Sequence, residues 1–111
     1  MQISEDKRGD VTVVSIDGSV DALTAGEVDA YLDRLVSEGL TQLVLDLSKV
    51  DYVSSAGLRS LLTTLKSARQ VGGDLRLAAA RESVHKVLAM AGFTSIMKSY
   101  PDAGAAVASF S

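Results

Sequence analysis

Two adjacent serines, Ser54 and Ser55, stand where a polar stretch gives way to apolar residues at helical spacing. A hydroxyl at the first positions of a helix faces backbone N–H groups that lack a partner, and it faces the positive end of the helix dipole. A phosphate dianion is stabilised there, so such a serine can act as a phosphorylation switch. The alternative is that a serine here only caps the helix, which contributes about 1 kcal/mol.

Few other residues could do chemistry. The single histidine, His85, falls within a predicted helix, and the chain has no cysteine and no second histidine to support it as a base. Asp46 could act at the sheet edge where α/β proteins place active sites, or it could anchor the turn that follows its strand. No phosphate-binding loop follows any predicted strand. These patterns favour a protein that is not an enzyme and holds no cofactor or metal ion.

The composition predicts one domain that spans residues 1–111. Hydrophobic residues make up 47% of the chain, and 11 basic against 14 acidic residues give a formal net charge of −3. This balance does not favour a nucleic-acid partner. No apolar run reaches the length of a membrane span, and the first residues lack the apolar core of a signal peptide. We therefore expect a soluble, cytoplasmic domain without a membrane contact.

Strands and helices are predicted to alternate from the start of the chain. The β-branched segment 11–16 predicts a strand, and residues 2–7 predict a short partner strand. Thr24 and Glu27 have the spacing of a capping box, with a hydroxyl at the N-cap and a carboxylate three residues later. Apolar residues at helical spacing follow, and Gly39 is expected to end this helix.

The serine pair is predicted to lie between a central strand and a long helix. Residues 43–47 form a nearly continuous apolar run, which is typical of an internal strand covered on both faces. A short polar turn should follow. Ser55 then opens a helix to about Val71, whose apolar stripe consists of Leu58, Leu61, Leu62 and Leu65.

The last third of the chain continues the alternation. A strand is predicted at residues 74–79, then a helix that stops at Gly92, and a short strand near 95–98. Pro101 is suited to the first turn of a final helix. Strands that alternate with helices indicate crossover connections around a largely parallel sheet, so the fold class is α/β.

The run from Leu43 to Leu62 resembles the signature of STAS domains, the family of the anti-sigma factor antagonists, written D-x-S-x-V-x-x-(I/V/M)-D-S-(S/T)-G-L. The matching residues are Asp46, Leu47, Ser48, Val50, Ser55, Gly57, Leu58, Leu61 and Leu62. Residues 18–21 resemble the family's glycine-and-aspartate turn, and residues 73–77 and 84–93 resemble its second half. The resemblance implies a mixed sheet of four or five strands flanked by about four helices.

The resemblance also implies a bacterial switch protein that exchanges partners. In this family a serine kinase that is also an anti-sigma factor binds the unmodified antagonist, phosphorylation ends that binding, and a phosphatase restores it. The phosphorylated position of the signature corresponds to Ser55, and Ser54 is the second choice. The chain departs from the signature where Ser54 replaces the usual aspartate and Ala56 replaces a hydroxyl residue.

A partner-binding surface is predicted around the start of the long helix. Its residues are expected to be Asp21, Ser54, Ser55, Gly57, Arg59, Ser60 and Thr63. Asp21 matches the turn aspartate of the family and would lie near Ser55 as a polar organiser. We expect a monomer with protein partners. The alternatives are a constitutive STAS module of a transporter or sensory assembly, without a phosphorylation cycle, and a small-ligand or nucleotide-binding domain, for which a phosphate loop is missing.

Overall fold

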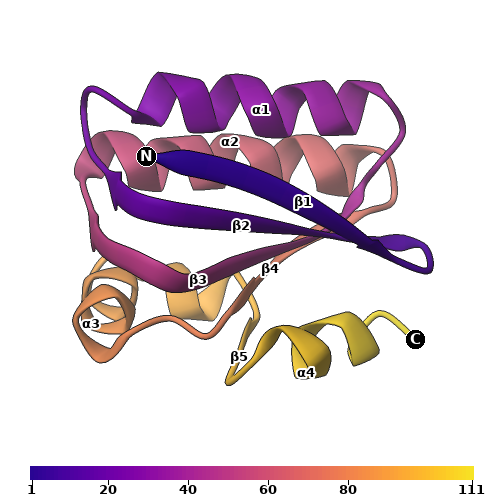
Figure 1. The fold of residues 1–111 in the computed structure, drawn as a ribbon. Coiled ribbons are helices and arrows are strands. Elements are labelled where there is room, and N and C mark those ends of the chain that lie inside the picture. The colour runs from indigo at the N-terminus through magenta and orange to yellow at the C-terminus, as the bar shows by residue number, and fades with distance from the viewer.

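The structure, a computed structural model that describes residues 1–111, consists of a five-stranded sheet with helices on both faces (Figure 1). The strands follow one another across the sheet in chain order. The first strand runs antiparallel to the second, and all later pairs are parallel. This arrangement confirms the predicted α/β class and the mixed, largely parallel sheet.

The elements alternate as the sequence predicts. The strands are β1 (Gln2–Arg8), β2 (Val11–Val20), β3 (Gln42–Val53), β4 (Asp74–Ala78) and β5 (Ser99–Tyr100). The helices are α1 (Ala25–Ser37), α2 (Ser55–Gln70), α3 (Glu82–Met90) and α4 (Ala103–Ala108), with a short 3-10 helix η1 (Phe93–Ser95). None of these helices has both the length and the apolar character needed to cross a membrane.

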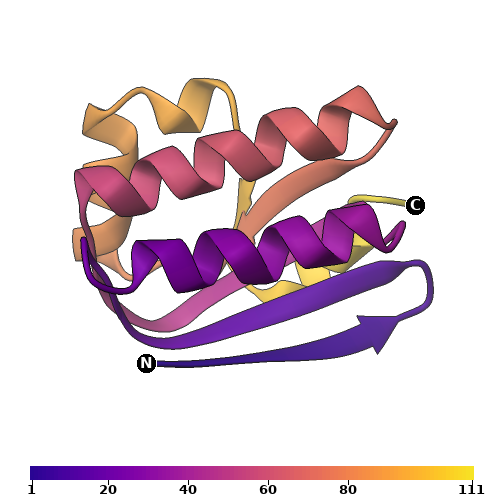
Figure 2. The same ribbon diagram turned by 90° about the horizontal axis from the view of Figure 1, so that it is seen from above.

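Helices α1 and α2 lie side by side on one face of the sheet, and α4 covers part of the other face (Figures 1 and 2). Successive residues of β3 serve the two faces in turn, as a strand requires. Leu43 and Leu45 belong to the larger core, which also takes in residues of α1, α2 and α3. Val44 belongs to a smaller core with Ala106 of α4. The sheet is therefore buried on both sides at its centre.

Strands β2 and β3 are longer than predicted. The prediction of a polar turn after residue 47 is wrong, because β3 continues to Val53. The two strands stay paired as far as Val20 and Val53, with register shifts on the way. These irregularities keep Val50 and Val53 in the core, while the polar residues between them face solvent. Because the pairing continues, the chain passes directly from the end of the sheet into α2.

The end of the chain also departs from the prediction. Residues 95–98, predicted as a strand, form the end of η1 and the turn after it, and the strand β5 comprises only Ser99 and Tyr100. Pro101 lies before α4 and not in its first turn. Asp102 is the N-cap, and its Oδ1 accepts a hydrogen bond from the Ala105 N–H at 2.7 Å.

Candidate functional site

Ser54 and Ser55 lie at the carboxyl end of β3, where α2 begins, and their environments differ. Ser54 is the N-cap of α2, and its Oγ accepts a hydrogen bond from the Gly57 N–H at 3.2 Å. Ser55 is the first helical residue and is exposed, and its hydroxyl forms no hydrogen bond within the chain. Ser54 therefore takes the capping role, and the hydroxyl of Ser55 is left free.

The end of β2 holds this turn in place. The Ser54 N–H donates to the Val20 carbonyl at 2.8 Å, directly after the paired residues Val20 and Val53. Gly57 packs against the same strand end. A Cβ at Gly57 would lie 2.9 Å from both Cγ1 and O of Val20, closer than real Cβ contacts allow. Gly57 was predicted to line the partner surface, which is wrong because it is buried and sets how closely α2 approaches the sheet.

The turn between β2 and α1, called here the Asp21 turn (residues 21–24), is fixed by the Asp21 carboxylate. Its Oδ1 accepts hydrogen bonds from the Leu23 N–H at 2.9 Å and the Thr24 N–H at 3.1 Å. The Thr24 hydroxyl donates to the Ser19 carbonyl at 2.8 Å. The predicted capping box of Thr24 and Glu27 is wrong, because the Thr24 side chain makes no cap hydrogen bond to the helix.

The Ser54 N–H binds the carbonyl of Val20, which is the residue directly before Asp21. The Asp21 turn and the two serines therefore lie next to each other, where β2 and β3 end. Leu23, at the tip of this turn, is 93% exposed. Leu23 is not among the residues predicted from the sequence to form the partner-binding surface. The sequence feature that could have indicated it is a large apolar residue in a turn, outside the apolar face of the following helix.

The three residues predicted on the outer side of α2 differ in exposure. Arg59 and Thr63 are exposed, and the Thr63 hydroxyl donates to the Arg59 carbonyl at 2.9 Å. Ser60 is only 7% exposed, and its hydroxyl donates to the Ala25 carbonyl at 3.1 Å. The prediction that Ser60 lines the surface is wrong because this residue joins α2 to the first turn of α1.

The charged residues of α2, the helix that Ser55 begins, are all basic. Helix α2 contains Arg59, Lys66 and Arg69 and no acidic residue. The carboxylate of Asp51, on the strand before the serines, accepts a hydrogen bond from the Ser19 hydroxyl at 2.7 Å, and this bond lowers the pKa of Asp51. A phosphate on Ser55 would thus meet no carboxylate on its own helix.

Residues 2–106 match the family model of the STAS domain. The chain belongs to the STAS family. BtrV of Bordetella bronchiseptica, a provisional anti-sigma factor antagonist, is 36% identical to it over 99% of this chain and 95% of that protein. The anti-sigma F factor antagonist of Paenibacillus polymyxa is 28% identical over 90% of this chain and 86% of that protein. The similar proteins are thus regulatory proteins.

Solved structures of low sequence identity share the fold. One is a crystal structure of a provisional anti-sigma factor antagonist from Thermotoga maritima. It aligns with this chain at a TM-score of 0.92 and 23% identity, and the alignment covers 96% of this chain and 92% of the Thermotoga chain. The Bacillus cell fate determinant SpoIIAA, solved in its phosphorylated form, covers 99% of this STAS domain and 100% of its own chain. Its TM-score is 0.76 and its identity 15%.

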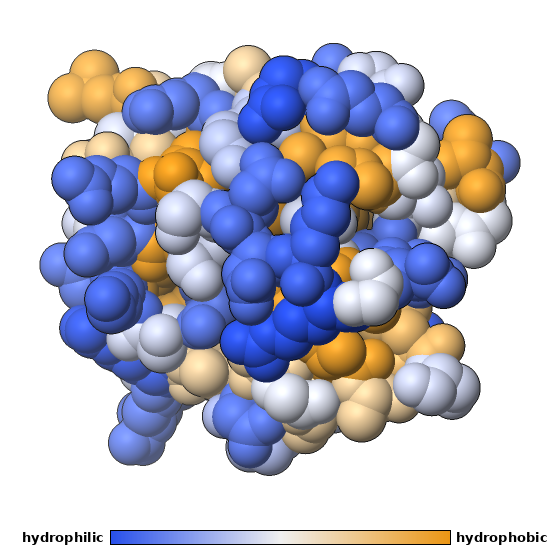
Figure 3. All heavy atoms as spheres, turned by 45° about the vertical axis from the view of Figure 1, so that its right-hand side comes forward, coloured by the Kyte–Doolittle hydropathy of each residue, from blue (hydrophilic) through white to orange (hydrophobic).

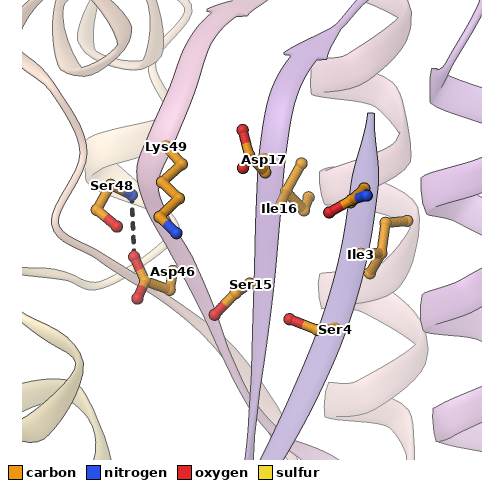
Figure 4. Close-up of a pocket in the computed structure, with 9 residues that line it drawn as sticks. Ile3, Ser4, Ser15, Ile16, Asp17, Asp46, Ser48 and Lys49 are labelled. Carbon is orange, nitrogen blue, oxygen red and sulfur yellow. Dashed lines mark hydrogen bonds between the residues drawn. The ribbon is translucent and has the colours of Figure 1, made fainter.

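The other residues singled out from the sequence lie apart from Ser55. Asp46 borders a polar hollow of about 510 Å³ that Ser15, Asp17 and Lys49 also line (Figure 4). The Asp46 carboxylate accepts a hydrogen bond from the Ser48 N–H at 2.9 Å, so it anchors the backbone of this STAS domain at that point. No residue of the Asp21 turn or of α2 lines the hollow.

His85 is exposed on α3, among residues that offer no metal site. No three His, Cys, Asp or Glu side chains of the chain are grouped so that they could hold a metal ion. The chemistry that remains at the edge of the sheet is that of the serine hydroxyl.

Proposed function

We propose that this STAS domain is an anti-sigma factor antagonist of the bacterial cytoplasm, which binds a serine kinase that is also an anti-sigma factor. Phosphorylation of Ser55 ends that binding, and a phosphatase restores it. The observation that carries the proposal is the free, exposed hydroxyl of Ser55 at the first position of α2. Membership of the STAS family and the relatives named as anti-sigma factor antagonists support it.

Ser55 is the better acceptor of the two serines. A kinase must bring a phosphoryl group in line with the hydroxyl oxygen, so the acceptor has to be accessible from solvent. The Ser54 side chain is half-buried and its oxygen is turned toward the Gly57 N–H. The replacement of the usual aspartate by Ser54 keeps the cap of α2, since both side chains offer an oxygen to the helix N-terminus.

The partner would contact what we call the switch surface: Asp21, Ser54, Ser55, Arg59 and Thr63. A phosphate adds between about −1.5 and −2 charge units to it. The domain tolerates this charge, because it lies at the amino end of α2. An interface does not, since a like charge or an apolar group opposite the phosphate costs several kcal/mol. A loss of about 3 kcal/mol already weakens binding more than a hundredfold.

The deciding experiment is phosphorylation of the purified chain by a serine kinase of the anti-sigma factor class from the same bacterium, followed by mass spectrometry. We expect one phosphate on the wild type and on Ser54→Ala, and none on Ser55→Ala. Ser83→Ala is the matched control, because Ser83 is another exposed serine in the first turn of a helix. A phosphate that persists on Ser55→Ala at the wild-type level would contradict the proposal.

A binding assay with the same kinase, run beside the mass spectrometry, separates the constitutive interaction module from the switch. A module would bind its protein partner with or without ATP, and no phosphate would be found on the chain. A switch protein would bind the kinase in the presence of ADP and lose it when ATP is supplied. Addition of a serine phosphatase should then restore the complex.

A further inference from the structure

We propose that Arg59 is the partner of the phosphate on Ser55 within the domain, so that modification creates an ion pair across the first turn of α2. The inference rests on the proposed function and deepens it by naming the residue that responds to the modification. It concerns the domain alone and needs no partner protein.

The positions on the helix favour this pair. Arg59 lies four residues after Ser55 on the regular helix α2, whose first hydrogen bond runs from the Leu58 N–H to the Ser54 carbonyl at 2.9 Å. Residues four apart lie on one face of a helix, with Cβ atoms about 5–6 Å apart. Helical side chains also lean toward the amino end, which directs the Arg59 side chain toward Ser55. An acid followed by a base four residues later is the favourable order.

Arg59 has no other partner. Every other arginine of the chain is held: Arg8, Arg34, Arg69 and Arg76 bind carboxylates, and Arg81 donates to the Ser48 carbonyl. The Arg59 side chain is exposed and forms neither a salt bridge nor a hydrogen bond. Its planar guanidinium can bind two phosphate oxygens at once without leaving an existing contact.

Nearby carboxylates are already engaged. Asp21 accepts the backbone N–H groups of its own turn, and Asp51 accepts the Ser19 hydroxyl. The chain has Ser54 where the signature has an aspartate, so no acidic residue stands directly before the acceptor. The phosphate would therefore meet one free cation close to it and no free carboxylate on the same helix.

The pair has a consequence for the switch surface. Before modification Arg59 offers a free positive charge to a partner, and afterwards that charge is bound to the phosphate. Phosphorylation would thus change the surface at two residues, one turn of helix apart. This is a larger change than the addition of a negative charge alone.

The test uses the full chain with phosphoserine inserted at position 55 during translation, so that no kinase is required. Urea unfolding is measured for the phosphorylated and unphosphorylated protein, each with and without Arg59→Gln. We expect the phosphate to lower the unfolding equilibrium constant about threefold more when Arg59 is present. Lys66→Gln is the matched control, because Lys66 is also exposed on α2 and unpaired, and it should leave the effect of the phosphate unchanged.

A second measurement observes the phosphate directly. In a phosphorus NMR titration, the second proton should leave the phosphate at a lower pH in the wild type than in Arg59→Gln, and Arg59→Lys should fall between them. Identical titration curves in the wild type and Arg59→Gln would overturn the inference. Since no kinase enters this test, that result would leave the proposed phosphorylation of Ser55 standing. A failed kinase assay would likewise leave this pair intact.

Discussion

At the scale of single residues, two neighbouring hydroxyls at the start of α2 have different roles. The Ser54 oxygen is occupied by the Gly57 N–H, which satisfies a donor that the helix cannot pair internally. The Ser55 oxygen is free in solvent. The chain thus has one serine that caps α2 and a second, free serine that the proposed kinase can modify.

Substitutions of Ser55 should separate charge from shape. We expect Ser55→Asp to weaken binding to the kinase partner about tenfold or more, because a fixed negative charge enters the interface. Ser55→Ala should bind within about twofold of wild type, since the hydroxyl has no bond to lose. Isothermal calorimetry measures both affinities. Tight binding by Ser55→Asp together with lost binding by Ser55→Ala would contradict the switch.

Leu23 is expected to anchor the partner. Its side chain is 93% exposed on a turn that three hydrogen bonds of Asp21 and Thr24 hold rigid. Leu23→Ala should weaken partner binding about tenfold without changing stability, because an apolar side chain on a rigid turn loses little entropy on docking. Val71→Ala is the control, since Val71 is also exposed but lies beyond the other end of α2. Equal effects of both substitutions on the affinity would argue against an anchor at Leu23.

At the scale of elements, periodicity together with helix start and stop signals predicted the four α-helices and a largely parallel sheet. The short helix η1 was missed, and a predicted strand overlaps its end. The second half of β3 was also missed, because alternation of buried and exposed residues breaks where the strand bulges. Ser60 was wrongly placed on the surface. A serine within a helix is predicted to be exposed because it is polar. Burial of Ser60 is favourable only because its hydroxyl binds the Ala25 carbonyl of α1, which the sequence of α2 does not show.

A pair of glycine substitutions tests how α2 is positioned. Gly57→Ala should lower the free energy of unfolding by about 2 kcal/mol, because the added Cβ would lie 2.9 Å from backbone and side-chain atoms of Val20. Gly26→Ala, also in the first turn of a helix, meets nothing within 4 Å and should be neutral or stabilising. Thermal unfolding by circular dichroism compares them. Equal stability of the two variants would contradict the close packing at Gly57.

Asp74 connects three elements and should make stability depend on pH. Burial alone would raise the pKa of Asp74, but hydrogen bonds from Arg76 and Arg69 outweigh it and hold the pKa below the ordinary 3.8. Arg76 in turn donates to the Ser109 carbonyl at 2.7 Å, which holds the end of α4. The ionised carboxylate therefore stabilises the fold above pH 3.8, and this stability is lost as the pH falls through the lower, folded-state value.

Asp74→Asn should accordingly cost about 2 kcal/mol at pH 7, because Arg76 and Arg69 lose their carboxylate. Urea unfolding of the wild type and the variant, at pH 7 and at a series of lower pH values, measures the difference. We expect the difference to shrink as the pH falls through the lowered pKa of Asp74, because the wild-type carboxylate then binds a proton as well. If the difference in the free energy of unfolding between the two proteins stayed the same as the pH fell, the charge of Asp74 would not contribute to stability.

At the scale of the whole molecule, the switch surface and the stabilising contacts lie in different places. The surface occupies the edge of the sheet where β2 and β3 end, and the cores lie between the sheet and its helices. The exposed face in Figure 3 is mostly hydrophilic, with hydrophobic residues in separate patches. Charged residues 5–8 occupy the outer strand β1, which discourages edge-to-edge pairing with a second copy. These features are compatible with the proposed exchange of partners by a monomer.

Because the site lies outside the cores, phosphorylation should change contacts without changing the fold. We expect amide NMR signals of the phosphorylated domain to shift only near the Asp21 turn and in the first two turns of α2, where the new charge acts through the N–H groups and Arg59. Signals from α4 serve as the internal control, since α4 lies on the other face of the sheet, away from the end of β3 (Figure 1). Shifts spread through the whole sheet would instead indicate a conformational switch, and repulsion at the contact surface would then not explain how the partner is released.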